Sequence, residues 1–357
     1  MKINKFFLAG VLISMCFACV EKSENNETSK TLKKSTDTSV SNLYPQEVNL
    51  SDLKGTEFAL TLENKLSDSK NSVYAPAFLF AWQEIKNFYK SPVDVSNLNS
   101  QDFKLINESN TFKDALNKDE YETTVNVIPE GVEASAYFKK TLPFAVKFHP
   151  QQYPIIFGSN EIKSFGVNYP DESLSDYFEI LYYLDDEHFA IKLYPEDTSS
   201  EIVLAKGINL SGTFTELLAN TNKWIGVGRK EKKVKEKAWR YSFEERDYLS
   251  IPVMKFNIGT NYSSLEGQRF TTDSKQKEHM IAKAYQRTAF MLDEYGAVVE
   301  SYADVVAVDS VGLAHVEVST PKNMIFDKPF VIFIKKKDSS NPYFAMKVVN
   351  AELMEKK

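Results

Sequence analysis

The sequence predicts a single α+β domain with mostly antiparallel sheets. Most segments with helical apolar periodicity precede residue 121, whereas short runs rich in β-branched and aromatic residues dominate after it. Helices followed by strands, rather than alternating with them, are typical of this class. With 357 residues, 43% of them hydrophobic, and no internal repeat, the chain is long enough to bury a large core.

Charge and composition narrow the range of partners. The formal net charge of −6 and the pI near 5.5 argue against a general nucleic-acid binder, which normally carries a basic excess. We therefore expect no nucleic-acid partner and a monomeric protein.

The N-terminus has the three parts of an export signal. A basic start is followed by an apolar run at residues 6–18 and by small residues next to a cysteine. Ala18-Cys19 resembles the cleavage site of a bacterial lipoprotein signal, which would make Cys19 the lipid-bearing first residue. Cys16 is the poorer candidate, and an ordinary cleaved secretory peptide is the alternative.

The sequence predicts a signal peptide at residues 1–19, a flexible polar tether at 20–48 and the folded domain at 49–357. The polar segment 21–42 has too few large apolar residues to order itself. Its acidic, Asn-rich start resembles the segment after the lipidated cysteine in surface-exposed lipoproteins of some Gram-negative bacteria. We expect an exported protein, lipid-anchored to the cell envelope, with the outer surface as the favoured side.

Helices are predicted where apolar residues recur at helical spacing, and some begin at a capping residue or proline. The helix opened by Ala75-Pro76 is apolar around most of its girth, so we expect it to be central. The predicted helices cover residues 56–66, 75–90, 109–116, 209–222 and 273–284.

Strands are predicted for alternating or β-branched runs that are bounded by turn residues. Two hairpins are expected, with turns at residues 185–187 and 337–341. The predicted strands cover residues 71–74, 121–128, 132–138, 144–148, 161–168, 178–184, 189–194, 250–258, 287–292, 331–334 and 343–349.

The sequence contains no recognisable catalytic constellation. Its four histidines are scattered, no glycine-rich phosphate loop or GxSxG elbow occurs, and both cysteines lie in the signal region. The lysine run at residues 230–237 is interleaved with glutamates, which favours a solvated face over a polyanion site. We expect neither enzymatic activity nor a cofactor or metal, although an acid-pair polysaccharide enzyme stays open.

Six segments, in order, resemble the serpin family. The ending FDKPFVIFIKKKDSSNPYFAMKVVN resembles the family's C-terminal signature, and RTAFMLDEYGA resembles the strand and hinge before its reactive loop. VMKFNIGTNYSSL is similar to the family's L-P-K-F strand, with Met254 in place of the proline. The other three segments are NSVYAP, ASAYFKKTLPF and EILYYLDDEHFAIKLYPED. Between Lys90 and Ala134 the chain is shorter than the family, and its loop from Gly296 to Phe326 is longer.

The resemblance implies a serpin-like fold with a long reactive loop near the C-terminus. In such inhibitors a protease cleaves the loop, and the freed segment inserts as a new strand into the main sheet. The implied hinge and insertable positions are Glu294, Gly296, Ala297, Val299, Ser301 and Ala303. The implied scissile bond is Ser310-Val311 or Leu313-Ala314, and the implied anchor is Phe326, Pro329 and Phe330. Lys255 and Glu294 are expected to form a salt bridge on neighbouring strands.

Two observations on the loop itself refine the expected function. A strand with period two would put Ala297, Val299 and the following odd-numbered residues onto the core and both acids outward. No Lys or Arg occurs from Gly296 to Pro321, so a serine- or cysteine-type protease that accepts apolar or small residues fits better than a trypsin-like one. The first hypothesis is a lipid-anchored serpin-type protease inhibitor. The alternative is a non-inhibitory serpin-like surface lipoprotein that acts as a binding or structural module, with the segment permanently in the sheet.

Overall fold

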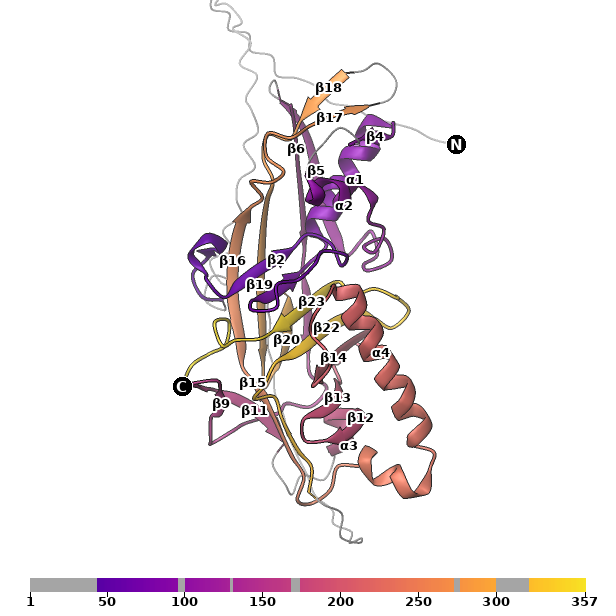
Figure 1. Cartoon of the computed structure of the whole chain (residues 1–357), viewed down its shortest axis with the longest axis vertical. Helices are drawn as coiled ribbons and strands as arrows, with labels where there is room; N and C mark the ends of the chain where they lie inside the picture. Colours follow the sequence, from indigo (N-terminus) through magenta and orange to yellow (C-terminus); the bar gives the residue numbers. More distant parts are fainter. Residues whose placement is uncertain (1–43, 96–99, 129–130, 168–173, 273–276, 300–320) are drawn as a thin grey trace, which may run out of the picture. The chain divides into compact units, whose positions relative to one another are not determined.

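The computed structural model describes residues 44–95, 100–128, 131–167, 174–272, 277–299 and 321–357 (Figure 1). Thr38–Lys357 group into one compact unit with a continuous hydrophobic core. The described elements are of the α+β class, as predicted. Cys19, Ser301, Ala303, Ser310, Val311, Leu313 and Ala314 lie outside the described residues.

The main sheet has five strands and carries the predicted hinge. β1 is parallel to β16, and the other neighbours are antiparallel. In spatial order the strands are β1 (Val48–Asn49), β16 (Met254–Asn261), β19 (Tyr285–Asp293), β20 (Gly296–Val299) and β7 (Lys140–Pro143). A separate hairpin, β5 (Tyr121–Ile128) and β6 (Gly131–Phe138), leads along the chain into β7.

The second sheet has seven strands and forms the centre of the core. Its two middle strands are almost completely buried, and β2 and β3 are its only parallel pair among the described residues. In spatial order the strands are β12 (Phe178–Asp185), β13 (His188–Leu193), β14 (Ser200–Lys206), β22 (Phe330–Lys336), β23 (Phe344–Val348), β3 (Asn71–Tyr74) and β2 (Thr56–Ala59).

A third sheet of four strands receives the chain after residue 320. Its edge strand β21 is parallel to its neighbour β15. The strands are β21 (Asn323–Ile325), β15 (Tyr248–Pro252), β11 (Ser164–Val167) and β8 (His149–Pro150). The smaller sheets are β9 (Ile155–Phe157) with β10 (Asn160–Ile162), and β4 (Val93–Asp94) with β17 (Arg269–Thr272) and β18 (Lys277–Met280).

Two of the helices are long enough to position other elements. α1 buries Leu79, Phe80, Trp82 and Ile85 in the core, as expected for the helix after Pro76. α4 begins at a capping box formed by Thr213 and Glu216. The helices are α1 (Ala77–Tyr89), α2 (Gln101–Glu108), α3 (Leu174–Tyr177) and α4 (Phe214–Glu231), with 3-10 turns η1 (Leu50–Asp52) and η2 (Lys235–Tyr241).

Three helix predictions were wrong, and at two of these segments strand pairing outweighed local periodicity. Residues 56–66 form β2 and then an irregular segment, in which Leu60 and Leu62 are both buried in the core. Residues 109–116 are a turn after α2, and residues 277–280 form β18. α4 starts later and runs further than predicted, because Thr213 rather than Asn209 caps it.

Most predicted strands are present, with four differences. Residues 161–167 are divided at Lys163 between β10 and β11, which belong to different sheets. Residues 250–258 are divided at Val253 between β15 and β16, which belong to different sheets. The strand predicted at 144–148 lies earlier, at Lys140–Pro143, and continues only as a bridge at Phe144. β14 was not predicted, although its apolar run places it beside β22 in the core.

Candidate functional site

The segment after Glu294 and Tyr295 is a strand of the main sheet. β20 pairs with β19 on one side, where Ala297 faces Leu292. On the other side it pairs with β7, where Ala297 faces Leu142. The first four residues of the predicted insertable segment are therefore already hydrogen-bonded on both edges.

The turn between β19 and β20 is fixed by backbone hydrogen bonds. The carbonyls of Glu294 and Tyr295 accept from the amides of Phe148 and Phe144, each at 2.9 Å. The Asp293 carboxylate accepts from the amide of Tyr295 at 2.9 Å. The exposed Tyr295 ring also has the ammonium of Lys147 3.8 Å from its centroid. The hinge is thus anchored to the segment that follows β7.

Gly296 occupies a position where the backbone of β7 comes very close. A Cβ atom placed on Gly296 would lie 2.4 Å from the carbonyl oxygen of Leu142 and 2.7 Å from the Cα of Pro143. Real Cβ atoms do not approach backbone atoms so closely, so glycine is required for β20 to enter the sheet here.

Successive side chains of β20 face opposite sides of the sheet. Ala297 and Val299 lie in the main core, at 0% and 3% exposure. Val298 belongs to a second small cluster with Tyr44, Ala289 and Met291. The odd-numbered residues therefore point inward at the two described positions, as the alternation in the sequence suggests.

The last residues of the predicted tether, 44–48, pack on the main sheet instead of remaining free. Tyr44 belongs to the same buried cluster as Val298, and the carbonyl of Pro45 accepts from the Asn257 side chain at 3.0 Å. Glu47 contacts Tyr285 and Arg287 of β19. Tyr44 is a large aromatic residue with apolar surface to bury, which is why the polar tether ends before it.

The predicted salt bridge between Lys255 and Glu294 is not formed. Lys255 faces Met291 across β16 and β19, so Asp293, two residues further on, shares its face of the sheet. Glu294 lies in the turn and on the opposite alternation. Burial raises the pKa of Asp293, and the charge of Glu294 raises that pKa further, while Lys255 partly offsets both effects.

A buried ion pair holds the chain where it returns from the segment outside the described residues. The ammonium of Lys322 lies 2.5 Å from a carboxylate oxygen of Asp247. The other carboxylate oxygen accepts from the amide of Lys322 at 2.7 Å. The Lys322 ammonium also donates to the carbonyl of Trp239 at 3.3 Å. Lys322 is therefore bound through both its side chain and its backbone.

Asp186 holds the next residue of the same edge strand. It accepts from the amide of Asn323 at 2.8 Å and from the side-chain amide at 3.2 Å. The hydroxyl of Tyr183 donates to Asp186 at 2.6 Å. Burial raises the pKa of Tyr183, and the hydrogen bond to Asp186 raises it further, so the hydroxyl stays a donor.

The predicted anchor encloses a buried lysine, Lys206. Its ammonium donates to the carbonyl of Ile325 at 2.8 Å and to Asp327 at 2.7 Å. Phe326 and Phe330 are fully buried, with ring centroids 5.1 Å apart, and Pro329 between them is exposed. The segment after β21 is therefore tied to β14 at several points.

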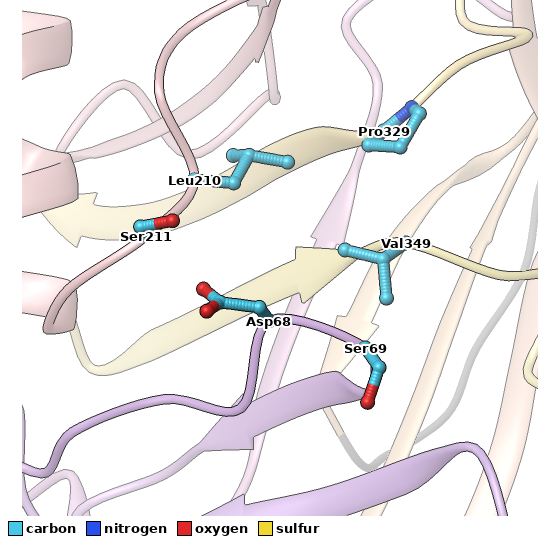
Figure 2. Close-up of a pocket in the computed structure, with 6 residues that line it drawn as sticks. All are labelled: Asp68, Ser69, Leu210, Ser211, Pro329 and Val349. Carbon is cyan, nitrogen blue, oxygen red and sulfur yellow. The ribbon is translucent and has the colours of Figure 1, made fainter.

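An open cavity of about 320 Å³ lies on the other side of the predicted anchor (Figure 2). Figure 2 shows that Leu210 and Pro329 lie across from Asp68 and Ser69, with Ser211 and Val349 completing the lining. Among the described residues, no group of three or more His, Cys, Asp or Glu side chains is arranged to hold a metal ion. No helix in the described part of the chain is long and apolar enough to cross a membrane.

Three solved structures are similar to this chain. A thermophilic serpin, Tengpin, in its native state has a TM-score of 0.44 and 13% identity over 86% of this chain and 100% of its own. Thyroxine-binding globulin in complex with thyroxine has a TM-score of 0.33, 10% identity, and coverage of 61% and 56%. A tumour-suppressing serpin has a TM-score of 0.34, 12% identity, and coverage of 61% and 55%. No protein-family model and no curated protein matches the chain. The chain thus spans about half the length of the last two structures.

Sequence reasoning missed Tyr44, Lys206, Asp247 and Lys322. Lys206 carries a usable signal, since a lysine that ends the apolar run IVLA must find a partner if the strand is central. Lys322 and Asp247 carry none, because they are 75 residues apart and both stand in polar surroundings in the sequence.

Proposed function

We propose that the chain is a serpin-type protease inhibitor whose loop is cleaved and then extends β20 into the main sheet. The observation that carries the proposal is the position of β20 between β19 and β7. The strand that insertion requires has already begun at its hinge end, so extension does not need a new nucleus.

The edges beyond β20 support the same proposal. β20 pairs with β19 only at residues 290–293, so within the described residues the same edge of β19 has no partner at residues 285–289. The edge of β6 that faces away from β5 likewise pairs with no described strand. Continuing the present register by two residues would place Ser301 between Thr288 of β19 and Phe138 of β6. Further chain can therefore be added by the same hydrogen-bonding pattern.

The target protease is proposed to accept apolar or small residues and to be of the serine or cysteine type. The support is the lack of Lys and Arg from Gly296 to Pro321, because a trypsin-like enzyme needs a basic side chain at the cleaved bond. We also propose export and lipid attachment at Cys19. Cys19→Ser should move the protein from the membrane fraction to the soluble fraction, and retention in the membrane fraction would contradict lipid attachment.

The test of inhibition uses the compact unit from Thr38 with pancreatic elastase, subtilisin and papain. An inhibitor gives a complex that survives denaturing gel electrophoresis, and its cleaved form melts at a higher temperature than the intact form. Cleavage by all three enzymes with neither result would refute the trap.

Two variants make this test specific to insertion. Ala297 is fully buried, so Ala297→Arg should block extension of β20 and give cleavage without a complex. Tyr295 is 58% exposed in the turn, so the matched variant Tyr295→Arg should still form the complex. Equal behaviour of both variants would contradict the proposed role of β20.

One observation favours the alternative, a serpin-like module that traps nothing. Val298 and Val299 are β-branched and buried on opposite faces, and Val298 shares a buried cluster with Tyr44. Bulky buried residues favour a strand that stays in place over one that moves rapidly. In that case the loop is cut with no complex and with no rise in melting temperature.

A further inference from the structure

Exposed basic residues gather along the second half of α4 and on to the start of η2, two elements that follow one another in Figure 1. We define the basic surface by five exposed residues: Lys223, Arg229, Lys230, Lys233 and Lys235. Within the described part of the chain, none of the five lies within ion-pair distance of a carboxylate. The basic surface therefore presents five cations outside any ion pair, next to one exposed acid, Glu236, on a protein whose formal net charge is −6.

Two acids beside the basic surface, Glu231 and Glu179, are already neutralised by other cations. Glu231 contacts Lys237, Arg240 and the hydroxyl of Tyr241. The hydrogen bond from Lys237 lowers the pKa of Glu231, so it stays ionised and paired. On the neighbouring strand β12, Glu179 is likewise shared by two lysines, at 2.7 and 3.2 Å. Glu231 and Glu179 each have two cations, so these pairs do not cancel the surface, and Glu236 offsets one of the five charges.

Two exposed valines stand among the cations. Val227 and Val234 are 42% and 43% exposed. Lys223, Val227 and Lys230 are four and three residues apart on α4, which places them on one side of the helix. The chain then continues in a tight turn, with the amide of Val234 donating to the carbonyl of Glu231 at 2.8 Å. The inward residues of α4, such as Phe214 and Leu217, are buried on the other side.

We propose that the basic surface binds the phosphate-bearing headgroups of an anionic lipid bilayer. Cations near such a surface are attracted individually, and exposed apolar side chains between them enter the headgroup boundary. A soluble polyanion, such as a sulfated polysaccharide or a nucleic acid, would satisfy the lysines but offers no apolar layer for Val227 and Val234. The combination of free cations and exposed valines therefore favours a membrane.

The predicted tether makes this contact effective. The sequence predicts a tether at residues 20–48, of which 20–43 lie outside the described residues, and a flexible chain of that length spans roughly 27 Å, from about 5.5 Å times the square root of its number of residues. A domain held that close to a bilayer meets its headgroups at a high effective concentration, so a weak contact is sufficient. The proposal does not depend on protease inhibition, and it stands if the loop traps nothing.

The test uses the compact unit from Thr38, which has no lipid, and vesicles of phosphatidylcholine with or without phosphatidylglycerol. The protein should sediment with the anionic vesicles only, and salt of about 1 M should release it, because it shortens the screening length to about 3 Å. Reversing three charges, Lys230→Glu, Lys233→Glu and Lys235→Glu, should weaken binding by more than about tenfold. The control reversal Lys54→Glu, Lys113→Glu and Lys118→Glu makes the same change of net charge at exposed residues elsewhere and should keep binding.

The valines separate a membrane from a soluble polyanion. Val227→Ser with Val234→Ser should weaken vesicle binding and leave binding to heparin unchanged. All these positions are exposed, so unchanged melting temperatures will show that the variants are folded. Vesicle binding that survives the triple reversal, or that falls equally with the control reversal, overturns the proposal. Charge-dependent binding that ignores the valines also overturns it and assigns a soluble polyanion as the partner.

Discussion

Lys322 and Asp247 form an ion pair whose side chains are 0% and 1% exposed, with 2.5 Å between nitrogen and oxygen. The pair lies one residue before β21, so it holds the point at which the predicted loop rejoins the body of the protein. A cut made upstream of Lys322 would leave this end of the chain in place while the other end is free to move.

Breaking this ion pair on one side should strongly destabilise the fold. Lys322→Met leaves the Asp247 charge buried without its partner, and we expect a loss of about 3–5 kcal/mol in the free energy of unfolding. Urea unfolding measures it. Arg269→Met breaks an exposed pair with Glu278 and should cost about 1 kcal/mol or less. Equal losses in the two variants would show that the Lys322 pair is not effectively buried.

Gly296→Ala should destabilise β20, because the new methyl group meets the backbone of β7. We expect a loss of about 1–3 kcal/mol in urea unfolding and faster limited proteolysis at residues 296–299. Gly226 has nothing within 4 Å of an added Cβ and lies inside α4, so Gly226→Ala should instead stabilise by about 0.5–1 kcal/mol. The prediction fails if both substitutions change stability in the same direction.

Asp293 should make the folded state less stable as the pH rises. Burial raises the pKa of Asp293 above its value in the unfolded chain, so the folded state binds the proton more tightly. Its contribution is greatest below the unfolded pKa and is lost as the pH rises through the folded pKa. Asp293→Asn keeps an acceptor for the amide of Tyr295 and should remove that loss, which melting curves across the acidic range measure.

Glu231 supplies the control of opposite sign. Its folded pKa is lowered by Lys237, so its contribution is present above the unfolded pKa and lost as the pH falls through the folded one. Glu231→Gln should lower stability at neutral pH and have no effect at strongly acidic pH. Parallel pH profiles for the two variants would contradict both assignments.

Glu294→Lys should not destabilise the main sheet. Lys255 shares a face with Asp293 rather than with Glu294, so no ion pair is lost. Removing the negative charge of Glu294 also lessens its electrostatic repulsion of the Asp293 carboxylate. We expect a change of no more than about 0.5 kcal/mol or a small gain. A loss of more than about 1 kcal/mol in the free energy of unfolding, measured with heat or urea, would contradict this prediction and support the ion pair between Lys255 and Glu294 that was expected from the sequence.

Tyr44→Ala should loosen the outer face of β20. Tyr44 is 8% exposed and fills a cluster with Val298, so its truncation should cost about 2–4 kcal/mol. The exposed Tyr153 gives a matched control, and Tyr153→Ala should change stability by no more than about 0.5 kcal/mol. Hydrogen exchange at the amides of Ala297 and Val299 should accelerate only in the Tyr44 variant.

The local sequence pattern was enough to predict those elements whose apolar side chains are themselves buried in the core. The alternation of Phe189–Leu193 and the dense apolar run of Val331–Ile334 each predict a strand, and both strands lie in the core. The class followed from the order of such segments. The helix predicted over Phe58, Leu60 and Leu62 was wrong, because apolar residues two positions apart fit one face of a strand as well as a broad face of a helix.

The resemblance predicts a hinge at Glu294 and Gly296, and it does not say whether the strand that follows is already paired. Whether β20 is paired depends on the backbone of Leu142 and Pro143, far away in the sequence. The same limit explains the partner of Lys255, since register decides which carboxylate shares its face. Contacts between distant residues, such as Lys322 with Asp247, leave no periodic signal.

The route by which the chain enters the fold has a mechanical consequence. Tyr44 precedes β1, so a pull on the N-terminus reaches the cluster that holds Tyr44 and Val298 before it reaches the pairing of Val48 with Ile258. Tension applied through the N-terminus would then expose β20 first, while β1 stays hydrogen-bonded to β16. Single-molecule stretching from the N-terminus should show a small early extension that Tyr44→Ala abolishes.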